Sequence, residues 1–184
     1  MKKLILTIVL GMTVGTVFCQ IYQIPLRDKI IASDIILEGS VISNRTIEGK
    51  DGNLYTLHDI KIKTLYKGVE YTKPNISILT RGGTTEDKIV SWTHLLSLVN
   101  GETGIFFLQR KESNLISTDE DSTEIFTVFS SGQGFIKFTD SPRGKIGTCP
   151  FQVYEDIDSG LISVVENMCG ETKRVFHSEK KVVF

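Results

Sequence analysis

The side chains of this 184-residue chain that could do chemistry are few and lie far apart in the sequence. The three histidines are His58 in TLHDI, His94 in WTHLL and His177 in VFHSE. None of them has the partner spacing of a zinc site, such as His-Glu-x-x-His or Cys-x-x-Cys. His58 is in phase with Ile60 and Ile62 of an alternating run, so we expect it at the mouth of a barrel, hydrogen-bonded to backbone rather than catalytic.

The glycine-rich and acidic segments also fall short of the motifs that carry chemistry. In SSGQGFIKF, residues 130–138, both serines precede the glycines, which excludes a Gly-x-Ser-x-Gly nucleophile elbow. The same segment lacks the third glycine of a dinucleotide fingerprint. The acidic run TDEDSTE, residues 118–124, lacks the glycine and the spacing of an EF-hand loop, so we interpret it as a solvated loop. The sequence therefore predicts no catalytic residue, no metal site and no cofactor.

The three cysteines bear on the compartment of the protein. Cys19 follows an apolar run, whereas Cys149 in GTCPF and Cys169 in NMCGE lie near the other end of the chain. If Cys19 is removed with a leader, the remaining even pair in an oxidising compartment predicts a Cys149–Cys169 disulfide. Such a bond would stabilise the fold by about 3 kcal/mol in the chain-entropy model. Two separate thiols are the alternative.

The first 19 residues have the pattern of a secretory signal peptide. A basic start, MKK, precedes the uncharged run LILTIVLGMTVGTVF, which is shorter than the roughly 20 apolar residues of a spanning helix. Val17 and Cys19 fit cleavage before Gln20. A lipoprotein that retains Cys19 is the alternative, but Phe18 stands where such proteins have a small residue. We therefore expect a secreted, periplasmic or cell-surface protein without a membrane span after cleavage.

Composition narrows the class of partner. The chain has 21 basic and 22 acidic residues, and its net charge of -1 offers no basic field for nucleic acid. Its 40% of hydrophobic residues is enough for a core, and a mature chain of about 165 residues is the size of one domain.

The spacing of apolar residues indicates β-strands in most of the chain. In LYTLHDIKIKTLYKG, residues 54–68, alternation places Ile60 and Ile62 on one face and Lys61, Lys63 and Leu65 on the other. The turn signal GKDGN joins this strand to DIILEGSVIS in a hairpin. Further strands are expected in NISILT, which ends at a glycine pair, and in GIFFLQ, EIFTVFS and GFIKF. Short strands at these intervals predict a small barrel or sandwich, with a minor helical part in LRDKIIAS.

The last part of the chain is harder to interpret. SPRGKIGTCPF has the composition of a loop, and GLISVVENMCG fits either a short helix or one more strand. We expect residues 20–139 to form a β-barrel domain and residues 140–184 to form a loop-rich extension packed on it.

These segments resemble a known module. The order SDIILEGSVI, LYTLHDIKIKTLYKG, ISILTRGG and LVNGETGIFFL is similar to an all-β module at the N-terminus of many bacterial secreted and surface proteins, including some exported by the type IX secretion system. Tyr66, Lys67 and Gly68 match its aromatic-Lys-Gly strand end, and Gly101 with Glu102 match its Gly-Glu turn. The resemblance implies an OB-type antiparallel barrel, related in architecture to netrin and metalloproteinase-inhibitor domains. The inhibitors of animals reach a catalytic zinc with an N-terminal cysteine, whereas the first residue predicted for the mature chain here is Gln20.

Two functions follow as hypotheses. The first is a non-enzymatic binding or assembly module that contacts a protein or glycan of the cell envelope. Its candidate anchor is Trp92, the single tryptophan of the chain, although this ring could instead pack over the end of the barrel. The second is an exported hydrolase or protease-regulating protein whose site is assembled from scattered positions.

Overall fold

The computed structural model describes residues 22–92, 95–111, 124–142, 144–170 and 173–176. The predicted leader with Cys19, both His94 and His177, and residues 118–123 of the acidic run lie outside this part of the chain. The described residues are mainly β-strands with two short α-helices, so the prediction of a mostly β protein is confirmed. No helix among them is long and apolar enough to cross a membrane.

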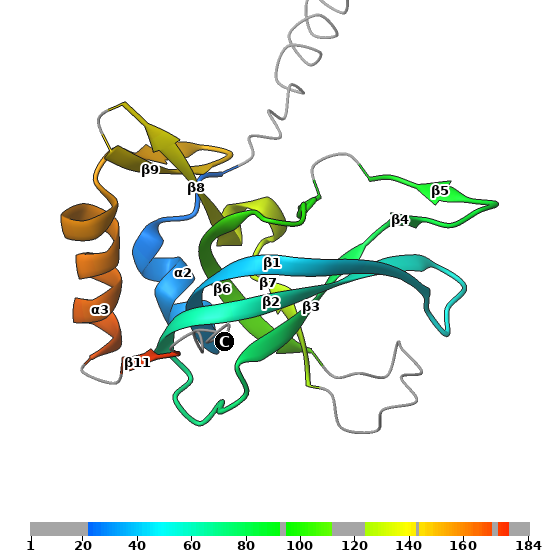
Figure 1. Ribbon diagram of the computed structural model, residues 1–184, viewed down its shortest axis with the longest axis horizontal. Coiled ribbons are helices and arrows are strands. Elements are labelled where there is room, and N and C mark those ends of the chain that lie inside the picture. Colours follow the sequence, from blue (N-terminus) through cyan, green and yellow to red (C-terminus); the bar gives the residue numbers. More distant parts are fainter. Residues whose placement is uncertain (1–21, 93–94, 112–123, 143, 171–172, 177–184) are drawn as a thin grey trace, which may run out of the picture.

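Five strands close into a ring (Figure 1). They are β1 (Ile35–Glu48), β2 (Leu54–Lys67), β3 (Asn75–Arg81), β6 (Thr103–Lys111) and β7 (Ile125–Val128). Strand β1 pairs antiparallel with both β2 and β6, and β6 pairs antiparallel with β7. The circuit closes because β2 pairs antiparallel with β3, and β3 pairs parallel with β7. Every ring strand therefore has a neighbour on both sides.

The other elements lie around this ring. They are α2 (Leu26–Ala32), the hairpin of β4 (Gly83–Thr84) and β5 (Ile89–Val90), β8 (Phe135–Ser141), β9 (Gly144–Cys149), β10 (Gln152–Tyr154), α3 (Ser163–Cys169) and β11 (Arg174–Val175). Strands β8, β9 and β10 continue the sheet outward from β6, and β11 pairs with β2. In Figure 1 the two helices lie at one end of the ring and the β4–β5 hairpin projects at the other.

Two apolar cores explain the continuous apolar runs in β1 and β6. Ile35 and Phe106 belong to the core inside the ring, whereas Ile36 and Phe107 belong to a second core under α2 and α3. Successive side chains of a strand point to opposite faces, so a strand covered on both faces must be apolar at every position. The helices thus bury the outer face of β1 and β6.

The predicted alternation of buried and exposed side chains along β2 is confirmed in the middle of the strand and wrong near its end. Ile60 and Ile62 are buried in the inner core, and Lys61 and Lys63 are exposed. Leu65, predicted on the face of the lysines, is instead fully buried in the same inner core. The β1–β2 pairing shifts register in three places, and each irregularity lets the chain change face. Strict alternation therefore fails across the shifts.

Residues 140–170 are more regular than the predicted loop-rich extension. SPRGKIGTCPF contributes the end of β8 and all of β9, and GLISVVENMCG is helical. Strand β9 fits against its neighbours because Gly147 has no side chain: a Cβ there would lie 2.9 Å from Cγ2 of Ile136. The helical segment Ile157–Ile162 and α3 then place Leu161 and Val165 in the second core.

Candidate ligand-binding groove

The inner face of the sheet changes from apolar to polar where β1, β2 and β3 extend past the core. Beyond Ile60 on β2 the same face carries His58, and beyond Ile78 on β3 it carries Thr80. Asn44 of β1 is paired directly with His58. Because paired residues share a face, these three polar side chains meet across three neighbouring strands.

His58 is held by two side chains and is 3% exposed. Its Nδ1 lies 2.7 Å from Oδ1 of Asn44, and its Nε2 lies 2.8 Å from Oγ1 of Thr80. The Asn44 amide donates from Nδ2 to the Leu98 carbonyl at 3.0 Å, which fixes Oδ1 as the acceptor facing the ring. Nδ1 of His58 therefore carries the proton, and Nε2 accepts from the Thr80 hydroxyl. The expected place at a mouth of the inner core is right, but the partners are side chains rather than backbone.

Burial sets the charge of this histidine. Desolvation lowers the pKa of His58 to about 4, and the opposing field of Asp59 is the smaller effect. The ring is therefore neutral at physiological pH. Asp59 itself points to the other face of β2, where its carboxylate accepts from Ser43 at 2.6 Å and from Ser77 at 2.9 Å.

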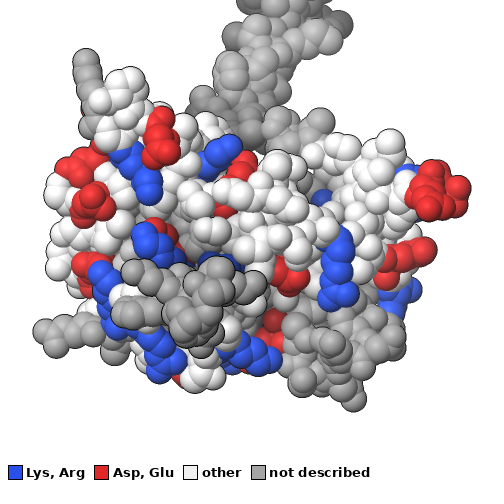
Figure 2. Space-filling view, viewed as in Figure 1, with Lys and Arg blue, Asp and Glu red and all other residues white. Residues whose placement is uncertain are grey.

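These side chains form the floor of a groove of about 470 Å³. One wall is the β4–β5 hairpin, which we call the arm, and the other is the following loop. The lining includes Asn44, Thr46, Thr56, His58, Thr80, Arg81, Ile89, Trp92, Leu96 and Ser97. The floor is thus rich in uncharged hydroxyl and amide groups. Figure 2 shows mostly uncharged surface over the arm, with acidic side chains at its tip.

Two glycines bring the arm close to the sheet. Gly82 has φ +94°, and a Cβ there would lie 2.7 Å from the Val90 carbonyl oxygen. A Cβ on Gly83 would lie 2.6 Å from Cγ2 of Thr46. Thr56 also donates to the Gly82 carbonyl at 2.8 Å, which ties the base of the arm to β2. The predicted end of the third strand at this glycine pair is confirmed.

Trp92, the predicted anchor, lies at the rim of the groove and is 56% exposed. It does not fill the end of the ring. Leu98 occupies that place, buried in the inner core, and Leu96 packs against it. The structure therefore brings Trp92 together with His58 in one groove. Asn44 and Thr80 were not predicted, although Thr80 is a polar residue in phase with the buried Ile76 and Ile78 of its strand.

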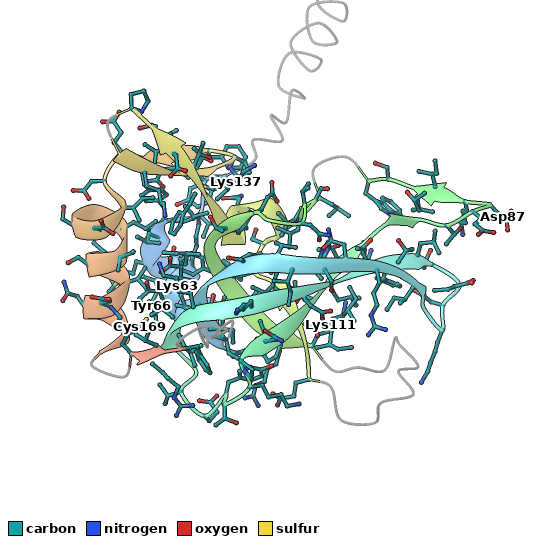
Figure 3. The ribbon with its side chains drawn as sticks, viewed as in Figure 1. Lys63, Tyr66, Asp87, Lys111, Lys137 and Cys169 are labelled. Carbon is teal, nitrogen blue, oxygen red and sulfur yellow. The ribbon has the colours of Figure 1, made fainter. Side chains whose placement is uncertain are left out.

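The predicted disulfide is not formed. Cys149 and Cys169 are free thiols, and both pack against the second core. Cys149 ends β9, whereas Cys169 lies at the far end of the helical residues 157–169. Figure 3 shows Cys169 near Tyr66, at the end of α3 away from β9. The helix between them keeps the two thiols apart.

In the described part of the chain, no three His, Cys, Asp or Glu side chains gather in a way that could hold a metal ion. Glu38 is nearly buried and accepts from Lys63 at 2.6 Å and from the Tyr66 hydroxyl at 3.3 Å. One carboxylate with two donors is a structural ion pair.

No protein-family model matches this chain, and no curated protein matches it either.

Proposed function

We propose that this protein is an exported, non-enzymatic binding module that holds a glycan of the cell envelope in the groove between β1–β3 and the arm. The observation that carries the proposal is the floor of fixed, uncharged hydrogen-bonding groups beside a half-exposed tryptophan. A sugar presents hydroxyl groups at its edges and C–H groups on its faces. Hydroxyl and amide side chains match the edges, and an indole ring matches a face.

The state of His58 supports recognition over catalysis. A general base needs a pKa near the working pH and a free nitrogen within reach of the substrate. The pKa of His58 is about 4, and both of its ring nitrogens already have partners. Its role in the proposed module is to hold β1, β2 and β3 in register beneath the ligand.

The strand circuit supports the proposal that the ring is an OB-type barrel. Such barrels have five strands, are partly open, and bind oligonucleotides and oligosaccharides across strands 2 and 3 with the neighbouring loops. The groove likewise lies over β2 and β3. Since the net charge is -1, an oligosaccharide is the better match of those two ligand classes. Secretion to the periplasm or cell surface belongs to the same proposal and rests on the leader pattern of residues 1–19.

A protein partner is the second candidate, favoured by exposed apolar side chains at the groove. Ile89 on the arm is 77% exposed, and Trp92 at the rim is also exposed. Exposed apolar side chains grouped on one face are typical of protein contacts. A protein partner would use the outside of the arm rather than the polar floor.

The test is a screen of the mature protein against an array of surface oligosaccharides, followed by calorimetry on the best binder. Trp92→Ala is the probe, and Phe151→Ala is the matched control because Phe151 is an exposed aromatic outside the groove. We expect Trp92→Ala to weaken binding at least about fivefold and the control to leave it unchanged. No binder on the array, or equal effects of the two substitutions, would contradict the proposal.

A further inference from the structure

A second cavity opens where the strands β3 and β7 of the ring separate. The parallel pairing of these strands is short and ends at Ile78 and Phe126. Directly beyond it, residues 79–81 of β3 and residues 127–128 of β7 line a cavity of about 250 Å³, which we call the side cavity. It shares Thr80, Arg81, Leu95 and Leu96 with the lining of the groove. The side cavity therefore borders the groove directly.

Two cationic side chains line the side cavity. Arg81 ends β3 and Lys111 ends β6; Figure 3 shows Lys111 beside β3. In the described part of the chain neither of them forms an ion pair. Arg110, by contrast, lies 3.2 Å from Glu70 and 3.7 Å from Glu124. The described residues thus leave two positive charges at the side cavity without a paired carboxylate.

Asp51 lies near Arg81 but is held by other groups. Tyr55 pairs with Arg81 across the β2–β3 ladder. A hydrogen bond to Asp51 raises the pKa of Tyr55, and the positive field of Arg81 opposes that rise. The Asp51 carboxylate accepts from the Tyr55 hydroxyl at 2.7 Å and from Nδ2 of Asn53 at 2.8 Å, without an ion pair to Arg81. The guanidinium group of Arg81 is therefore available to a ligand.

The rest of the lining suits an anion. Tyr55, Leu79 and Val128 form a buried apolar part of it. Apolar walls beside charges of one sign focus their field, because the protein interior has a lower dielectric constant than water. Ser131 supplies an uncharged donor: its Oγ accepts from the backbone N–H of Leu96 at 2.9 Å, which leaves the hydroxyl hydrogen for another acceptor. The side cavity thus combines positive charge with a hydroxyl donor.

The positive charge is confined to one end of the groove. Among the described residues that line the groove, Arg81 is the only one with a charged side chain, since His58 is neutral at physiological pH. A single-stranded nucleic acid carries a phosphate at every nucleotide and needs cationic groups along the whole groove. One cationic cavity instead matches one anionic group on a ligand that is otherwise uncharged.

We propose that the oligosaccharide in the groove is acidic, and that a carboxylate or sulfate group on it binds in the side cavity between Arg81 and Lys111. This inference rests on the proposed glycan function and names the class of glycan. A guanidinium group donates two parallel hydrogen bonds to such an anion, whereas an ammonium group acts as a point charge. Arg81 therefore orients the acidic group, and Lys111 adds attraction.

The first measurement compares each acidic oligosaccharide with its own neutral form. The array carries oligosaccharides of uronic acids beside their carboxyl-reduced forms, sulfated oligosaccharides beside their desulfated forms, and a short oligothymidylate. We expect the mature protein to bind one acidic series about tenfold more tightly than its neutral form. Added salt should reduce this preference, because it screens the two cations. The series that shows the preference identifies the anion as a carboxylate or a sulfate.

The outcomes separate this inference from the function on which it rests. Equal binding of the acidic and neutral forms would overturn the inference and leave the glycan groove standing. No binding to any oligosaccharide would contradict both. Binding to the oligothymidylate that is tighter than to any acidic oligosaccharide would assign the cations to nucleic acid and overturn the inference.

The second measurement removes the charges one at a time. The variants are Arg81→Gln and Lys111→Gln, and the matched controls are Arg27→Gln on α2 and Lys61→Gln on β2, exposed positions outside the groove and the side cavity. We expect each cavity variant to lower the ratio of acidic to neutral affinity about three- to tenfold, and the controls to leave this ratio unchanged. A smaller folded fraction cancels in the ratio, because both ligands are measured on the same variant. A native ratio in both cavity variants would overturn the inference.

Discussion

The amide of Asn44 determines which nitrogen of His58 carries the proton. Its Nδ2 donates to the Leu98 carbonyl, so its Oδ1 must accept from Nδ1–H of the imidazole at 2.7 Å. The same amide therefore connects β1, β2 and the loop that closes the inner core. Through Nε2 the connection continues to Thr80 on β3.

The neutral state of His58 predicts a pH dependence of stability. Its pKa is about 4 in the folded protein and near 6.5 in the unfolded chain, so the unfolded chain binds the extra proton between these values. The stabilisation is complete above pH 6.5 and is lost as the pH falls toward 4. We expect a loss on the order of 2 kcal/mol over this window, since water at the groove screens part of the effect. Urea unfolding of the native protein and of His58→Gln at several pH values measures it, and parallel pH dependences of the two would contradict it.

The hydroxyl group of Thr80 is predicted to stabilise the folded protein. Thr80→Val keeps the shape but leaves Nε2 of His58 without its donor, which costs about 1–3 kcal/mol of unfolding free energy. The control is Thr139→Val on β8, an exposed position where the change should stay within about 0.5 kcal/mol. Chemical denaturation compares them. Equal stabilities of the two variants would show that the Thr80–His58 bond contributes nothing.

Substitutions at two neighbouring residues test which side chains of β2 face the inner core. Ile62→Ala removes a buried side chain of the inner core and should cost about 2–5 kcal/mol, whereas Lys61→Ala on the opposite face should cost at most about 0.5 kcal/mol. Lys61 is the better control because Lys63 is paired with the nearly buried Glu38. Similar losses of unfolding free energy in both variants would refute the assigned phase.

The close approach of the arm predicts a special cost at Gly82. Gly82→Ala and Gly144→Ala both place an alanine at positive φ, but only the first puts a Cβ against backbone, 2.7 Å from the Val90 carbonyl oxygen. We expect Gly82→Ala to be at least about 1 kcal/mol more destabilising than Gly144→Ala. Thermal and urea unfolding measure the difference. Equal stabilities of the two variants would mean that the close approach of Gly82 to the Val90 carbonyl is not required for folding.

The sequence predicted the fold correctly where local patterns determine the structure. Alternation located Ile60 and Ile62 in the core, and the GKDGN turn predicted the β1–β2 hairpin. Periodicity could not foresee that Leu65 is buried, because the register shifts that move it depend on the pairing partner. It also missed β9, which is short and has two glycines.

The candidate groove was predicted only in part for a similar reason. His58 and Trp92 stood out by residue type, but Asn44 and Thr80 gain their meaning from cross-strand pairing, which a single strand pattern does not encode. The predicted disulfide was wrong because an even number of cysteines does not show that any two of them lie close together. The helical residues between Cys149 and Cys169 separate them.

The central claim is that ligand binds in the groove over β2 and β3, and backbone amide chemical shifts test it most directly. The mature protein, labelled with ¹⁵N, is titrated with the best oligosaccharide from the array. We predict that the largest shifts fall on Asn44, His58, Thr80 and Trp92, with Phe151 and Cys149 unaffected. Shifts confined to α3, or to the outside of the arm, would contradict the proposed site.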